Sequence, residues 1–178
     1  FLTVAAAATG ARVLVVDLNA DRLELAVRLG AQETLVAGTA TLADRVAELG
    51  MDVDVFFEVS GSKAGWESVI DAAHPGATIV PVGIQKGEPP AALAHWTLAE
   101  LTIVGTVAHV MAADLPDAVR LLESRADWSD IAETVLPLDE VVSGGLVPLI
   151  AGAPLQTKTL IDPWIDAPRT ARHERTPA

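Results

Sequence analysis

Short apolar runs alternate along the chain with segments whose apolar residues recur every three or four positions. The runs predict strands at 12–17, 34–36, 53–57, 77–80, 101–104, 131–136 and 157–161. The periodic segments predict helices at 2–9, 20–29, 42–49, 66–73, 93–100, 115–125 and 139–149, with Pro116 in the first turn of its helix. Strands that alternate with helices of about ten residues are typical of parallel βαβ units, so the pattern predicts an α/β fold.

The composition narrows the class of protein. The chain has 178 residues and a net charge of −12, so its surface should repel nucleic acid and anionic membranes. No apolar run approaches the roughly 20 residues that span a bilayer. The chain contains no cysteine and no tyrosine, which excludes thiolate zinc sites, a Cys nucleophile and a Tyr general acid within it.

Asp17 ends the first predicted strand, directly before a helix. In dinucleotide-binding folds a carboxylate at this place accepts hydrogen bonds from the adenosine ribose, and its charge disfavours a 2′-phosphate, so NAD is favoured over NADP. The alternative is an aspartate that only supports the N-terminus of the next helix. Arg22 is either a residue over the adenine face or an ordinary surface arginine.

A dinucleotide fold also needs a glycine-rich turn before its first helix, and no G-x-G-x-x-G pattern precedes Asp17. The chain starts at Phe1, within a predicted helix. We therefore expect a fragment whose glycine loop and first, central strand lie upstream. Without that strand the sheet must close up or gape, and we expect marginal stability.

Four ordered segments resemble the medium-chain dehydrogenase/reductase family, namely residues 1–31, 54–61, 73–83 and 100–106. The resemblance extends to about residue 162, and residues 139–146 look most like the zinc-type butanediol and polyol dehydrogenase branch. It implies a Rossmann-type doubly wound parallel sheet that here lacks its first strand. It also implies hydride transfer between NAD and a secondary alcohol or ketone.

The resemblance also assigns cofactor contacts. Asp17 would bind the ribose and Arg22 would lie by the adenine, while backbone at Ser60 and Gly61 would pass near the adenosine. The residues expected near the nicotinamide are Val82, Gly83, Ile84, Gly105, Thr106 and Val107, and Lys158 would reach the pyrophosphate. The alternatives are turn geometry for Gly83 and Gly105 and a solvated strand-edge charge for Lys158.

The catalytic zinc of the family sits in a separate domain with Cys, His and acidic ligands, and this chain matches no such site. Its four histidines are scattered and are expected to be surface or turn residues: His74, His95, His109 and His173. Without the metal nothing here polarises a carbonyl, so the chain alone is expected to be inactive.

We expect three parts: an NAD-binding domain at 1–138, a helix and strand at 139–162 that return toward the absent domain, and a flexible tail at 163–178. Two alternatives stay open, a non-catalytic or regulatory nucleotide-binding remnant and a methyltransferase-like domain. The default location is the cytoplasm. A homodimer or tetramer could form through the apolar edge at 101–104 and 106–110.

Overall fold

The computed structural model of the chain describes residues 1–89, 91–125, 128–153 and 156–171. It divides into two compact units, Phe1–Val110 and Met111–Ala178. The sequence analysis placed the boundary after residue 138 instead. The difference arises because the strand at Thr134–Pro137 pairs only with later strands and so belongs to the second unit.

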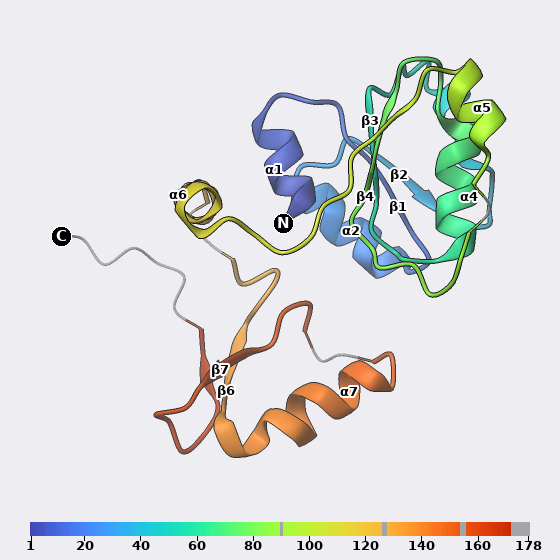
Figure 1. The fold of residues 1–178 in the computed structure, drawn as a ribbon. Coiled ribbons are helices and arrows are strands. Elements are labelled where there is room, and N and C mark those ends of the chain that lie inside the picture. The colour runs from blue at the N-terminus through green and yellow to red at the C-terminus, as the bar shows by residue number, and fades with distance from the viewer. Residues whose placement is uncertain (90, 126–127, 154–155, 172–178) are drawn as a thin grey trace. The chain divides into compact units, whose positions relative to one another are not determined.

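The first unit alternates helices and strands, as predicted (Figure 1). Its elements are α1 (Leu2–Ala8), β1 (Leu14–Asp17), α2 (Ala20–Arg28), β2 (Glu33–Val36), α3 (Leu42–Glu48), β3 (Val55–Glu58), α4 (Lys63–Ala72), β4 (Thr78–Pro81), α5 (Leu93–Leu98) and β5 (Thr102–Ile103). Helix α4 begins three residues earlier than the pattern predicted, because the Ser62 side chain caps it by accepting a hydrogen bond from the Gly65 N–H at 3.0 Å.

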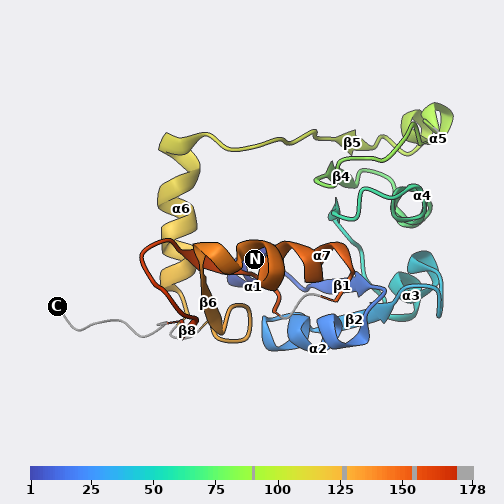
Figure 2. The same cartoon turned by 90° about the horizontal axis from the view of Figure 1, so that it is seen from below.

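The strands of this unit form two separate parallel sheets. One consists of β1 and β2, and the other has the order β3-β4-β5. Figure 2 shows the β1–β2 pair as a group apart from β4 and β5. A doubly wound sheet has the strand order 3-2-1-4-5-6, and removal of its first strand leaves these two groups. The strands of the sheet are therefore separated into two groups and do not close into one continuous sheet.

One apolar core still joins the two sheets. It gathers side chains of α3, α4, β3 and β4, with Phe56, Trp66 and Ile79 among its buried members, and Leu14 of β1 packs against it. The indole rings of Trp66 and Trp96 add an edge-on contact at 6.0 Å. Figure 1 shows α4 and α5 on one side of the strands and α1 and α2 on the other.

The second unit is built around its own small sheet. Its elements are α6 (Met111–Glu123), β6 (Thr134–Pro137), a 3-10 turn η1 (Leu138–Glu140), a π-helical turn η2 (Val141–Leu146), α7 (Val147–Ile150), β7 (Leu160–Asp162) and β8 (Arg169–Thr170). Strand β6 lies in the middle, parallel to β7 and antiparallel to β8. None of the helices in the described ranges has the length and apolarity needed to cross a membrane.

Two features of this unit differ from the sequence prediction. Helix α6 begins at Met111, so Pro116 lies inside the helix and not in its first turn, and its missing N–H cannot bond to the Ala112 carbonyl. The segment predicted to be a flexible tail from residue 163 includes β8, whose pairing with β6 is a long-range contact that local composition does not reveal. Residues 172–178 of that predicted tail, with His173, lie outside the described residues.

Candidate functional site: the carboxyl ends of β1, β3 and β4

Asp17 is the last residue of β1, and its side chain is 30% exposed. One of its oxygens, Oδ1, accepts a hydrogen bond from the Asn19 N–H at 2.8 Å. Asn19 in turn caps α2 by accepting from the Asp21 and Arg22 N–H groups at 2.8 and 3.2 Å. The carboxylate is thus fixed at the junction of strand and helix while remaining accessible to solvent.

The acceptor capacity of Asp17 is only partly used. Besides the Asn19 bond at Oδ1, its Oδ2 lies 3.8 Å from a guanidinium nitrogen of Arg22, whose side chain is 58% exposed. A carboxylate offers about four lone-pair sites, so both oxygens retain room for hydroxyl donors. Arg22 lies beside Asp17, on the first turn of α2.

The loops that follow β3 and β4 form the second part of the site. The Glu58 main-chain carbonyl accepts hydrogen bonds from both Val82 and Gly83 N–H groups at 2.8 Å, and the Gly61 carbonyl accepts from the Lys86 N–H at 3.1 Å. Ser60 and Gly61 are therefore held against the segment of Val82, Gly83 and Ile84. The structure brings together five of the residues that the sequence analysis selected.

Two glycines make this close approach possible. A Cβ atom on Gly83 would lie 2.2 Å from the Gly61 nitrogen, and one on Gly61 would lie 2.3 Å from the Ile84 carbonyl oxygen. Gly61 also has a φ of +61°, a conformation that side chains disfavour. Gly83 thus serves the contact between the two loops, which is a stronger demand than turn geometry alone.

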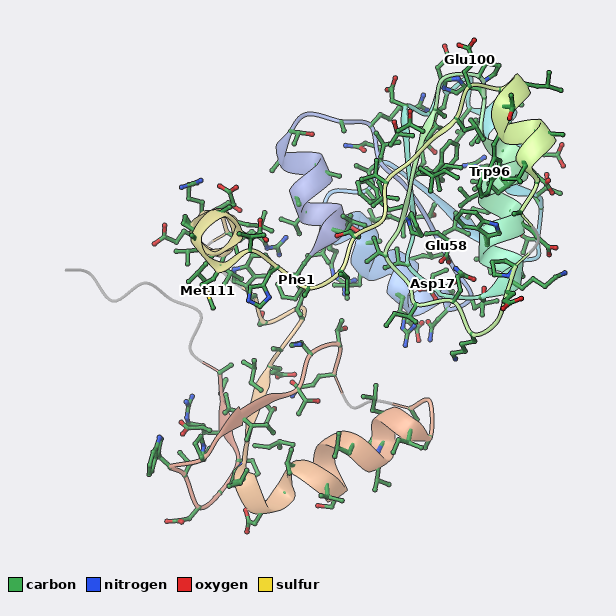
Figure 3. All side chains as sticks on the ribbon, in the orientation of Figure 1. Phe1, Asp17, Glu58, Trp96, Glu100 and Met111 are labelled. Carbon is green, nitrogen blue, oxygen red and sulfur yellow. The ribbon has the colours of Figure 1, made fainter. Side chains whose placement is uncertain are left out.

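A buried carboxylate supports both loops, and sequence reasoning missed its role. The Glu58 side chain is 3% exposed and accepts hydrogen bonds from Ser60, Gly61 and Gln85. Figure 3 labels Asp17 and Glu58 toward one end of the first unit and Glu100 at the opposite end. The signal that selected Asp17, a carboxylate closing an apolar strand, is present at Glu58 as well.

The remaining predicted residues are not gathered by described contacts. Gly105, Thr106 and Val107 follow β5 in an exposed loop, and a Cβ on Gly105 would meet nothing within 4 Å. Lys158 belongs to the second unit, where it precedes β7 with an exposed side chain and donates its backbone N–H to the Ile131 carbonyl at 2.9 Å.

A zinc site does not fit the residues at hand. The chain has no cysteine, and across the described ranges no three His, Asp or Glu side chains group in a way that could hold a metal ion. No catalytic step is therefore assigned to a metal held by these residues.

The strand arrangement defines an α/β protein with a Rossmann-type fold. A family model described as zinc-binding dehydrogenase matches residues 1–124. The chain belongs to this family of oxidoreductases.

Curated relatives agree with the family assignment. The chain is 32% identical over 138 residues to the L-threonine 3-dehydrogenase of Shewanella halifaxensis. The aligned residues cover 76% of this chain and 40% of that protein. The chain is also 32% identical over 139 residues to the same enzyme of Ruegeria pomeroyi, covering 76% of this chain and 41% of that protein. The chain thus spans about two fifths of the length of these relatives.

Solved structures show the same fold. The 2R,3R-butanediol dehydrogenase of Bacillus subtilis superposes with a TM-score of 0.79 at 25% identity, over 91% of this chain and 47% of that one. An alcohol dehydrogenase of Escherichia coli CFT073, complexed with cofactor NADH, superposes with a TM-score of 0.73 at 18% identity, over 90% of this chain and 46% of that one.

Proposed function

We propose that this chain is the cofactor-binding part of an NAD-dependent, zinc-type alcohol or polyol dehydrogenase. The observation that carries the proposal is the accessible carboxylate of Asp17 at the carboxyl end of β1, held by Asn19 and with acceptor sites to spare. The names of similar proteins support it, since one is a butanediol dehydrogenase and another is complexed with NADH.

In this proposal Asp17 binds the adenosine ribose and Arg22 lies by the adenine. The backbone of Ser60 and Gly61 passes the adenosine. Nearer the nicotinamide stand Val82, Gly83, Ile84, Gly105, Thr106 and Val107, and Lys158 reaches the pyrophosphate. Each of these residues, Lys158 apart, lies at or shortly after a strand's carboxyl end, where open α/β sheets bind ligands.

The substrate class in this proposal is a small secondary alcohol or ketone, and a zinc ion, were one held by residues outside this chain, would supply Lewis acidity. By itself the chain then binds nucleotide without turnover, because without the metal none of the residues identified here would polarise the carbonyl or take the alcohol proton. Association as a dimer or tetramer and action in the cytoplasm belong to the same proposal.

The test is titration calorimetry of the chain with NAD and with NADP. NAD should bind more tightly than NADP, because the Asp17 charge repels a 2′-phosphate. The substitution Asp17→Asn should weaken NAD binding by about 10- to 100-fold, the loss expected for charge-assisted hydrogen bonds, and should narrow the difference between the two cofactors.

The matched control is Asp21→Asn, which makes the same chemical change on the first turn of α2. It should leave NAD affinity within about twofold of the parent, as a surface substitution away from the site does. No detectable heat with NAD, or equal effects of the two substitutions, would contradict the proposal.

A further inference from the structure

Glu58 is the only buried polar or charged side chain within the described ranges, with 3% of its surface exposed. Removing a carboxylate from water is costly unless hydrogen bonds replace the lost solvation. No described ion pair includes Glu58. The charge must therefore be compensated by the neutral donors around it.

Those donors come from two different loops. The Oε1 atom accepts from the Ser60 N–H at 2.9 Å and from the Ser60 hydroxyl. The Oε2 atom accepts from the Gly61 N–H at 3.1 Å and from the Gln85 side-chain amide at 2.7 Å. Since Gln85 lies 27 residues further along the chain, this carboxylate joins the loop after β3 to the loop after β4.

The packing leaves little freedom for another side chain at this position. A Cβ on Gly65, in the first turn of α4, would lie 2.7 Å from Oε1 of Glu58, so the helix presses directly on the carboxylate. The N-terminal end of a helix favours a negative charge. The main-chain carbonyl of Glu58 also holds Val82 and Gly83, so both the side chain and the backbone of this residue act on the same two loops.

We propose that Glu58 is a positioning residue that locks the segments Ser60–Gly61 and Val82–Ile84 into one rigid surface for the cofactor. This inference rests on the proposed NAD-binding function. At 3% exposure Glu58 acts through the loops rather than by contact with the cofactor. The loop at Ser60–Gly61 serves the adenosine half, and the loop anchored by Gln85 serves the nicotinamide half.

Calorimetric titration with 5′-AMP and with NAD separates the two halves. In Glu58→Gln an amide replaces the acceptor and its NH₂ faces donors, so affinity for both ligands should fall by about tenfold or more. In Gln85→Ala only the link to the second loop is cut, so NAD affinity should fall several-fold while AMP affinity stays within about twofold. The matched control is Glu67→Gln, an exposed glutamate of α4 paired with Lys63.

Circular dichroism and the urea midpoint establish that each variant is folded, and Gln85→Ala decides the matter should Glu58→Gln fail to fold. Equal loss of AMP and NAD affinity in Gln85→Ala would overturn the inference, because a general loosening of the fold acts on both ligands alike. The inference would also be overturned if the parent binds NAD and the Glu58 and Gln85 variants bind it equally well. A parent that binds no NAD contradicts the proposed function itself, and the cofactor role of Glu58 with it.

Discussion

Asp17 and Glu58 each close an apolar strand, but their surroundings differ. Side chains alternate between the two faces of a strand, so Glu58 shares the packed face with Phe56, and both are buried. The burial of a carboxylate costs several kcal/mol, and the four hydrogen bonds to Glu58, each about 1.5–3 kcal/mol, offset that cost. Asp17 stays partly exposed, so only Asp17 is free to meet a ligand directly.

The contact between the two loops predicts a strong effect of Gly83→Ala. The added methyl would lie 2.2 Å from the Gly61 nitrogen and 2.8 Å from the Val59 carbonyl carbon, both of them backbone atoms. We expect a loss of about 1–3 kcal/mol in the free energy of unfolding, as for other overpacked sites, measured by urea denaturation. The control is Gly105→Ala, where a Cβ meets nothing within 4 Å and the change should stay within about 0.5 kcal/mol. Equal losses in the two variants would contradict this.

At the scale of elements, local signals predict most of the first unit. Helix α2 lies between the side-chain cap Asn19 and the stop at Gly30, both visible in the sequence. Long-range pairing was not visible, because β8 depends on a β6 strand more than thirty residues away. The same reason hid the bond between Glu58 and Gln85, while Asp17 was selected because its signal is local.

The ion pair between Asp162 of β7 and Arg169 of β8 predicts that the stability of this part of the fold depends on pH in the acid range. The Trp164 N–H, then the Arg169 guanidinium, hold the pKa of Asp162 below its ordinary value of 3.8. The pKa of Asp162 is lower in the folded chain than in the unfolded chain. The stabilisation of the fold by the Asp162 carboxylate is therefore fully present above the pKa of the unfolded chain. It is lost as the pH falls through the pKa of the folded chain. An NMR titration should place the Asp162 midpoint below 3.8.

Asp162→Asn supplies the second measurement for this link, because it cannot titrate. It should remove the acid-dependent loosening of the β6–β8 pairing, as followed by amide exchange at Ala171, whose N–H donates to the Glu133 carbonyl at 2.7 Å. The substitution Asp166→Asn, four residues further on, is the control and should leave that acid dependence in place. A midpoint for Asp162 at or above 3.8 would show that Trp164 and Arg169 do not hold the carboxylate in solution.

At the scale of the whole molecule, the split sheet leaves apolar surface uncovered. In a doubly wound sheet helices cover both faces, and parallel strands are buried on each side. Here Phe56 is 6% exposed on one face of β3, whereas Phe57 is 41% and Val55 43% exposed on the other. Strand β3 therefore gains packing energy on one face only.

Replacing either of the adjacent residues Phe56 and Phe57 by alanine tests this difference in burial between the two faces of β3. Phe56→Ala empties a packed site and should cost about 3–5 kcal/mol or unfold the chain outright, whereas Phe57→Ala, already half in water, should cost about 1 kcal/mol or less. Urea denaturation followed by tryptophan fluorescence measures both variants, with Trp66 and Trp96 in the first unit and Trp128 and Trp164 in the second. It should be repeated at several protein concentrations, because self-association would cover Phe57. A loss at Phe57 as large as that at Phe56, independent of concentration, would mean that this face of β3 is packed in solution and that the sheet is not open.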